Sequence, residues 1–217
     1  MTIVIILLLI GGYIYWNGIS EPAELKRLLV GKTQEQQDVI KYFFGKGGFL
    51  TKRISDAEYD NLVANKAGQT DFKQKALNKI GVDESEVREI EPVNFQWYDF
   101  DNSTYDKKGA DNIWRSSAYE ITWMFFSGSQ IMVYQYLFHM DKSEVKENTE
   151  EYFYKDVVSF STRTGTVQSK TGNAQINTNV FRINLPGDNF ETAIRSSDDS
   201  VERVIQGMKA KLREKKS

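Results

Sequence analysis

Two long apolar runs with a short polar turn between them form the most regular pattern in the chain. The runs cover 119–126 and 130–138, and the tripeptide Ser-Gly-Ser at 127–129 separates them. Alternate side chains lie on opposite faces of a strand, so this pattern predicts a β-hairpin with a buried face. The second face is apolar as well, since it carries Met124 and Phe126. We therefore expect a curled sheet, a closed barrel or a covering helix on that side, because a long exposed aromatic strip would favour aggregation.

Helical periodicity dominates the residues before this hairpin, from 20 to 91. Thr33 and Gln36 have the spacing of a capping box, and Ser55 and Glu58 repeat that spacing. A capping box satisfies free backbone N–H groups at the start of a helix, so each pair marks a helix N-terminus. The expected helices cover 21–30, 34–44, 56–65 and 72–80, and an acidic turn at 83–91 precedes Pro92.

The periodicity changes to two after residue 92, which indicates strands. A Pro-Gly-Asp turn at 186–188 separates two of these strands and predicts a second hairpin. Asp199 and Glu202 then begin a final helix, whose apolar residues recur at helical spacing as far as Leu212. The expected strands cover 93–98, 119–126, 130–138, 150–162 with a bulge near 155–156, 164–167, 180–185 and 189–194, and a polar loop covers 101–117.

This order of elements resembles the pleckstrin-homology-like (PH-like) fold, in which two bent sheets are covered at one open corner by a C-terminal helix. The resemblance lies in the stretches YEITWMFFSGSQIMVYQYLF, TEEYFYKDVVSFST, FRINLPGDNF and SVERVIQGMKAKL. The same stretches are similar to a group of uncharacterised bacterial membrane-anchored proteins. The resemblance implies an α+β chain in which 92–217 form a seven-stranded PH-like barrel or sandwich with a C-terminal helix, preceded by the helical segment 20–91.

The first 19 residues carry no charged side chain and include aromatic residues near their end. Tyr13, Tyr15 and Trp16 are of the types that settle at a bilayer interface. As a helix this run would be about 27 Å long, close to the thickness of a bilayer core. It lacks the basic start and the cleavage site of a signal peptide, so we expect an uncleaved transmembrane anchor over 1–19. A hydrophobic helix packed inside a soluble fold is the alternative.

Basic residues follow this anchor closely, and none precedes it. Lys26, Arg27 and Lys32 lie within 13 positions of its end, where they are diluted by Glu21 and Glu24. Because basic residues accumulate on the cytoplasmic side of membranes, they place the globular part in the cytoplasm. The sequence therefore predicts a single-pass membrane protein with a cytoplasmic domain.

Composition argues against several classes of function. A net charge of −2 over 217 residues provides no general attraction for nucleic acid. The chain has no cysteine, which excludes disulfides, thiolate metal sites and cysteine nucleophiles. Its one histidine, His139, falls in a predicted strand, where we expect a hydrogen-bonded structural histidine rather than a catalytic base. We therefore expect no enzyme activity, no cofactor, no metal and no nucleic-acid partner.

The loop after the first strand of the PH-like part carries candidate lipid-binding residues. Many pleckstrin-homology domains bind inositol phosphates through basic residues in this loop, so the resemblance implies a role for Lys107, Lys108 and Arg115. The closely spaced basic pattern of that family is not matched here. Three aspartates in the same loop would also cancel much of the attraction to an anionic lipid surface.

Carboxylates in the same region provide the remaining candidates. The stretch that begins at Asp99 has the opening spacing of a calcium loop, but it lacks glycine at its sixth position and has Ala110 at its twelfth. We therefore expect no calcium site there. An enzyme that uses carboxylates such as Asp99 and Asp101 is a further interpretation, and it requires two carboxylates to converge in a pocket with perturbed acidity.

These patterns together predict a membrane-anchored, non-enzymatic binding module that recognises a protein or peptide near the membrane. Binding of anionic lipid headgroups and carboxylate-dependent catalysis are the alternatives. For a peptide ligand, the expected site is the gap between an edge strand and the C-terminal helix, where backbone groups of the strand are free to pair. No pattern in the sequence indicates an oligomeric state.

Overall fold

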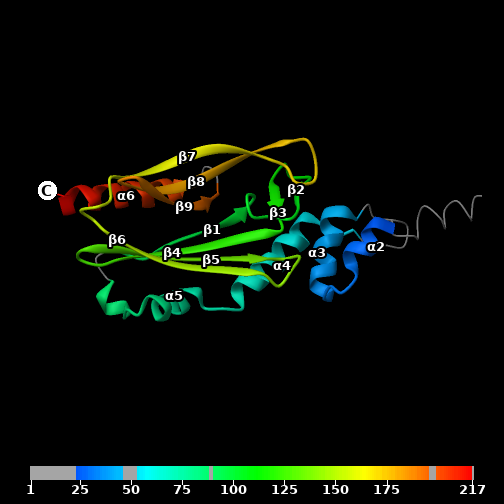
Figure 1. Ribbon diagram of the computed structural model, residues 1–217, viewed down its shortest axis with the longest axis horizontal. Coiled ribbons are helices and arrows are strands. Elements are labelled where there is room, and N and C mark those ends of the chain that lie inside the picture. The colour runs from blue at the N-terminus through cyan, green and yellow to red at the C-terminus, as the bar shows by residue number, and fades with distance from the viewer. Residues whose placement is uncertain (1–22, 46–52, 88–89, 196–198, 217) are drawn as a thin grey trace, which may run out of the picture.

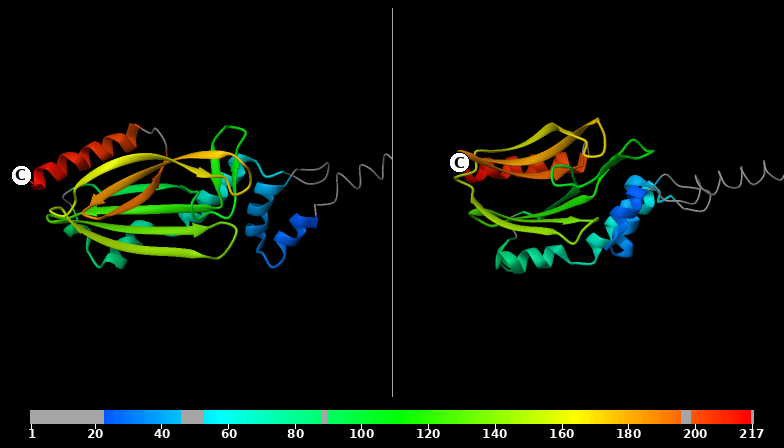
Figure 2. Two further views of the ribbon diagram at one scale, coloured as in Figure 1. Left: turned by 45° about the horizontal axis from the view of Figure 1, so that its top comes forward. Right: turned by 45° about the vertical axis from the view of Figure 1, so that its right-hand side comes forward.

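A computed structural model describes residues 23–45, 53–87, 90–195 and 199–216 (Figure 1). The described elements are helices and antiparallel strands, so the predicted α+β class is confirmed. A four-stranded sheet forms the middle layer of the molecule. Helices lie against one of its faces, and a three-stranded sheet with the last helix covers the other face (Figures 1 and 2).

The described part of the helical segment contains the helices and the turn that the sequence predicts. They are α2 (Ala23–Leu29), α3 (Gln34–Phe44), α4 (Asp56–Gly68), α5 (Phe72–Ile80) and the 3-10 turn η1 (Glu84–Glu86). Both capping boxes form, with Thr33 Oγ1 accepting from Gln36 N at 3.3 Å and Ser55 Oγ accepting from Glu58 N at 3.2 Å. Helix α4 continues three residues beyond its predicted end, because no glycine or proline interrupts it before its last residue.

Nine strands follow among the described residues, in three antiparallel sheets. The first sheet has the order β1-β4-β5-β6 and contains β1 (Val93–Asp99), β4 (Ala118–Phe126), β5 (Gln130–His139) and β6 (Val145–Phe153). The second has the order β7-β8-β9 and contains β7 (Ser159–Gln168), β8 (Gln175–Leu185) and β9 (Asp188–Ile194). A small hairpin consists of β2 (Asp106–Lys108) and β3 (Trp114–Ser116).

The predicted central hairpin is formed by β4 and β5, in a register that places Tyr119 opposite Phe138. Both of its faces are buried, which confirms that a further layer covers the second apolar face. Ile121, Phe125, Tyr134 and Phe138 pack with buried residues of α3, α4 and α5, and Met124, Phe126, Ile131 and Val133 pack with the second sheet and the last helix. The hairpin is therefore the shared wall of two cores.

Helix α6 (Asp199–Lys216) closes the second core, as the sequence predicts. Ile205, Met208 and Leu212 are buried in that core, and the helix lies beside the edge strand β7. The side chain of Val201, which the sequence placed on the same face, lies outside the described part. The expected peptide site between an edge strand and this helix stays a prediction.

The predictions for 150–162 and 164–167 identify residues that are mostly in strands, but they divide those strands at the wrong place. The chain turns at 154–158 and passes from the first sheet to the second, so the predicted bulged strand is the end of β6 and the start of β7. Tyr154 and Val157 in this turn are buried in the second core. The alternation of Tyr152 with Tyr154 and of Val158 with Phe160, joined across an assumed bulge, imitates one continuous strand, which explains the error.

The predicted polar loop over 101–117 contains the β2–β3 hairpin. This hairpin has a polar sequence because it docks on the helices through hydrogen bonds. Lys107 Nζ on β2 donates to Tyr42 O of α3 at 2.7 Å, and Arg115 on β3 binds Asp60 of α4. A pattern search for buried apolar residues does not detect a strand of this kind.

The two larger sheets contain four and three strands, which equals the predicted total, and the β2–β3 hairpin is additional. These sheets do not close into a barrel within the described residues, where β1 and β9 lie side by side without pairing. No helix of the described ranges is both long and apolar enough to cross a membrane. The predicted anchor over 1–19, including Tyr13, Tyr15 and Trp16, lies outside those ranges.

Candidate functional site

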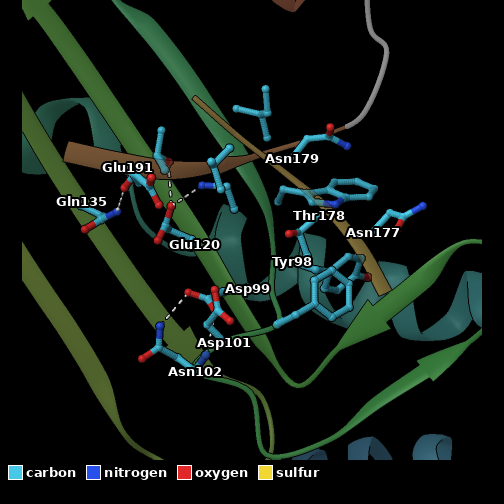
Figure 3. Close-up of a pocket in the computed structure, with 16 residues that line it drawn as sticks. Tyr98, Asp99, Asp101, Asn102, Glu120, Gln135, Asn177, Thr178, Asn179 and Glu191 are labelled. Atoms are coloured by element: carbon cyan, nitrogen blue, oxygen red, sulfur yellow. Dashed lines mark hydrogen bonds between the residues drawn. The ribbon is translucent and has the colours of Figure 1, made fainter. Parts of the chain in front are cut away.

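A pocket of about 300 Å³ lies where the two larger sheets come together at β1 and β9. Its walls are formed by the end of β1 and the residues after it, by Glu120 on β4, by Gln135 on β5 and by parts of β8 and β9. Figure 3 shows Glu120 and Glu191 on one side of this pocket, and Asn177 and Asn179 on another. Half of the lining residues carry a carboxylate or an amide in the side chain.

Glu120 is the most buried carboxylate of the lining, with 7% of its surface exposed. Its Oε1 accepts hydrogen bonds from Thr192 Oγ1 at 2.6 Å and from Ala193 N at 2.9 Å. Thr122 Oγ1 lies 2.7 Å from Thr192 Oγ1 and donates to it, because the proton of Thr192 is already engaged. These bonds join β4 to β9 and hold the Glu120 carboxylate in place.

The pKa of the Glu120 carboxyl is raised, chiefly by burial, although the hydrogen bonds from Thr192 and Ala193 oppose this and nearby Asp99 adds to it. Burial also raises the pKa of Asp101, and Asp99 is the next cause. Both carboxyls thus lie in surroundings that disfavour their negative charge. A positive group that entered the pocket would relieve this cost.

Asp99 and Asp101 both line the pocket, as the carboxylate interpretation of the sequence requires. Asp99 is held by Asn102, whose backbone N and side-chain Nδ2 each donate to it at 2.8 Å. Asp99 therefore has a fixed position at the end of β1. No three or more histidine, aspartate or glutamate side chains in the described structure are grouped so as to hold a metal ion.

Glu191 on β9 completes the set of four carboxylates in the lining. Arg182 on the neighbouring strand forms an ion pair with it, and Gln135 Nε2 donates to the Glu191 carbonyl at 3.1 Å. None of the described lining residues carries a positive charge of its own. The lining residues therefore carry a formal negative charge, and Arg182 and Lys170 outside the lining offset part of it.

No protein-family model, curated protein or solved structure matches this chain. The pocket is therefore interpreted from its own chemistry.

Two further cavities continue along β1 from the pocket. One of about 230 Å³ shares Trp97 and Tyr98 with it, and Arg195 lies 5.3 Å from the centre of the Trp97 ring. A groove of about 460 Å³ follows, which shares Ala64 and Tyr119 with the second cavity and runs between β4 and the α4–α5 connection. In the described structure no strand pairs with the outer edge of β1 along this path.

The turn between β7 and β8 is fixed to β2 by a buried carboxylate. Asp106 accepts hydrogen bonds from Lys170 N at 2.6 Å and from Ser169 Oγ and Thr171 Oγ1. The pocket-lining residues at 177–180 follow directly after this turn on β8. Asp106 therefore holds the β8 wall of the pocket against the β2–β3 hairpin.

The three predicted lipid-binding residues are near in sequence but are not brought together as a free basic surface. Arg115 is buried, and its five N–H groups meet acceptors on Asp60, Asp111 and Ile113 O. Lys107 donates to Tyr42 O and lies 4.3 Å from the Tyr42 ring centre. Of the three, Lys108 alone is exposed.

The sequence interpretation missed Glu120, Gln135 and Glu191. A signal for Glu120 was present, because it and Thr122 are polar residues on the strand face that otherwise carries Met124 and Phe126. A charged residue inside an apolar strand pattern indicates either a partner or a site. The convergence of Glu120 with Glu191, which is 71 positions later in the chain, could not be read from spacing.

Proposed function

We propose that this chain is a membrane-tethered, non-enzymatic binding module whose C-terminal part has a PH-like arrangement. Two sheets of four and three strands followed by α6 support the PH-like part of the proposal. The charge-free first 19 residues support the tether. The globular part is proposed to face the cytoplasm, since basic residues follow that segment.

The proposed ligand is an extended peptide with a basic side chain. The observation that carries this proposal is the negative pocket beside the outer edge of β1, an edge that has no paired strand in the described structure. Unpaired strand edges offer backbone N–H and C=O groups to an extended peptide, and an adjacent pocket selects a side chain. A volume of about 300 Å³ is at the lower limit of ligand pockets and suits one side chain.

Charge determines which side chain the pocket prefers. Burial disfavours the negative charge of these carboxylates, and a guanidinium group in the pocket would compensate that charge. The planar N–H donors of a guanidinium also form paired hydrogen bonds with the two oxygens of a carboxylate. Amide groups of Asn177 and Asn179 lie in the lining, where they can bind the peptide backbone. We therefore expect arginine or lysine at the selected position and rejection of acidic residues.

Fluorescence anisotropy tests this proposal with labelled peptides and the intact chain in mild detergent. A peptide with one arginine in an uncharged sequence should bind more tightly than the same peptide with glutamine at that position. Glu120→Gln should lower the affinity for the arginine peptide about tenfold, which is the effect expected for the loss of one charge-assisted hydrogen bond. Glu151→Gln on the exposed face of β6 makes the same change of charge away from the pocket and should have no effect.

Equal affinity for the two peptides would contradict the proposal, and so would an unchanged affinity of the Glu120→Gln chain. Binding of lipid headgroups stays a prediction from the sequence. Sedimentation with anionic liposomes at low and high salt tests it, because binding through Lys107 and Lys108 should weaken with ionic strength. A loss of liposome binding in a Lys107→Gln, Lys108→Gln chain would favour the lipid function over the peptide function.

A carboxylate-dependent enzyme is a second candidate, because Asp99 and Asp101 line one pocket and the pKa of Asp101 is raised. A peptide hydrolase that used these carboxylates would cut the arginine peptide, whereas the proposed binding module returns it intact. Mass spectrometry of the peptide after long incubation separates the two. Cleavage that Asp101→Asn abolishes would show an enzyme.

A further inference from the structure

His139, the only histidine of the chain, is the last residue of β5 and has 1% of its surface exposed. Its predicted place in a strand is confirmed, but the predicted hydrogen bonding of its ring is not. Neither ring nitrogen has a hydrogen-bond partner among the described residues. Most buried polar groups in proteins are paired, so an unpaired imidazole calls for an explanation.

Asp141, two residues later, is the nearest carboxylate to this ring. It is also buried, and its Oδ1 lacks a hydrogen-bond partner in the described structure. His139 Nδ1 and Asp141 Oδ1 are 4.0 Å apart, which is too far for a hydrogen bond. The two groups are therefore close enough to interact by charge, but they are not locked together.

The turn that contains these two residues, 139–144, is one of the places where the helical segment contacts the first sheet. Lys66 Nζ of α4 donates to His139 O at 2.8 Å, and Lys32 Nζ donates to Asp141 O at 2.9 Å. The turn itself is closed by a bond from His139 N to Glu144 O at 3.2 Å. A change of charge at the His139 ring thus acts at the point where two lysines of the helical segment are bound.

Burial lowers the pKa of His139, and the positive charge of Lys142 lowers it further, whereas Asp141 and Glu144 act in the opposite direction. The imidazole is therefore neutral at neutral pH. The charged or titratable groups around this turn are Asp141, Lys142, Glu144 and Lys146 on its own segment, Lys66 and Tyr59 on α4, Glu35 on α3, Lys32 before α3, and Tyr105 after β1.

We propose that His139 is an acid-sensitive switch, whose protonation loosens the 139–144 turn and the attachment of the helical segment to the sheet. A protonated ring needs either water or a direct bond to Asp141, and both require the turn to move from its packed position. Lys146 Nζ in the next strand donates at 2.7 Å to Asn102 Oδ1, and Asn102 lines the pocket. The switch does not depend on what that pocket binds.

The direction of the effect follows from proton linkage. Because the folded chain holds His139 at a lowered pKa, the unfolded chain binds more protons as the pH falls below 6.5. Acidification therefore lowers the stability of the folded chain. For this one group, the ratio of folded to unfolded chain falls by at most tenfold for each pH unit. The raised pKa values of Asp101 and Glu120 act with the opposite sign, since those groups bind protons more readily when folded.

Nuclear magnetic resonance of the intact chain in detergent tests the switch, because one histidine gives one set of imidazole signals. The titration midpoint should lie below 6.5, and Lys142→Gln should move it upward. Hydrogen exchange of the 139–144 amides, compared at pH 7 and pH 5 after correction for intrinsic rates, should show protection lost at the lower pH. A midpoint at or above 6.5, or unchanged protection, would overturn the proposal.

A variant without the imidazole separates the switch from general acid instability. The ratio of folded to unfolded His139→Gln chain should stay constant or rise between pH 7 and pH 5.5, whereas that of the natural chain should fall. If the variant does not fold, the titration and exchange measurements on the natural chain still decide the question. An equal acid loss in the variant and the natural chain would assign the effect to other groups.

Discussion

Replacement of Arg115 by methionine should destabilise the protein strongly, because this guanidinium joins the β2–β3 hairpin to helix α4. Its side chain is 3% exposed and binds Asp60 at 2.6 Å and Asp111 at 2.8 Å. Methionine keeps most of the buried volume but removes every N–H donor. The change therefore tests the ion pairs rather than the packing.

The magnitude follows from the exposure of the two carboxylates. Breaking a fully buried ion pair costs about 3–5 kcal/mol, because the remaining charge is left uncompensated. Here the side chains of Asp60 and Asp111 are 44% and 41% exposed, so water can solvate them after the change. We therefore expect a loss of about 2–3 kcal/mol in the free energy of unfolding.

Urea unfolding followed by circular dichroism measures this loss. Arg163→Met, on an exposed position of β7, is the matched control and should change the free energy by less than about 0.5 kcal/mol. The chain with both Asp60→Asn and Arg115→Met should show a smaller loss than the sum of the single changes. A stability of the Arg115→Met chain within 0.5 kcal/mol of the natural chain would refute this account of the network.

Three further stability predictions use the same urea assay. Met208→Ala should cost about 2–4 kcal/mol, because Met208 is buried in the second core; a loss below about 1 kcal/mol would show that α6 does not close it. Gly81→Ala should cost about 1 kcal/mol, since Gly81 has a φ of 82°, whereas Gly68→Ala in α4 should be neutral or stabilising; equal effects would contradict the left-handed cap. Thr192→Val should cost about 1–3 kcal/mol by removing the donor to Glu120.

The pKa of Asp111, measured in the folded chain, provides a second test of the hydrogen bonds made by Arg115. The hydrogen bonds from Arg115 lower the pKa of Asp111 to about 2. In the Arg115→Met chain, the pKa of this carboxyl should rise toward its ordinary value of 3.8, and the remaining hydrogen bond from Ile113 N should keep it below that value. Stability that depends on this pair is present above the unfolded pKa and is lost as the pH falls toward the folded value.

Local signals in the sequence predicted most of the elements of this fold. The capping boxes at Thr33 and Ser55 placed the starts of two helices, and both boxes form. The alternating runs around 127–129 predicted the central hairpin and the need to cover its second face, and both predictions are confirmed. Such features depend on neighbours within a few residues, which is why spacing alone reveals them.

The errors fall where tertiary contacts determine the structure. Tyr154 and Val157 in the turn at 154–158 are apolar because they are buried in the second core, and the sequence pattern alone predicts a strand there. The β2–β3 hairpin is polar because it docks on the helices through Arg115 and Lys107. Neither feature has a local pattern that distinguishes it from the alternative.

The pocket shows the same limit at the level of function. Asp99 and Asp101 were candidate carboxylates, and the structure places both in the lining. Glu120 and Glu191 come from different sheets, and their approach depends on how β4 and β9 meet. The predicted lipid-binding role of Arg115 assumed a free guanidinium, whereas its donors are engaged with two aspartates and a backbone carbonyl.

The central claim, that an extended basic peptide occupies the pocket between the sheets, is tested most directly by hydrogen exchange of the intact chain with and without an arginine peptide. Bound peptide should add protection at 97–102, 177–180 and 191–194, three segments that line the pocket. Protection confined to β6 or to the helical segment, with none in these three segments, would contradict it.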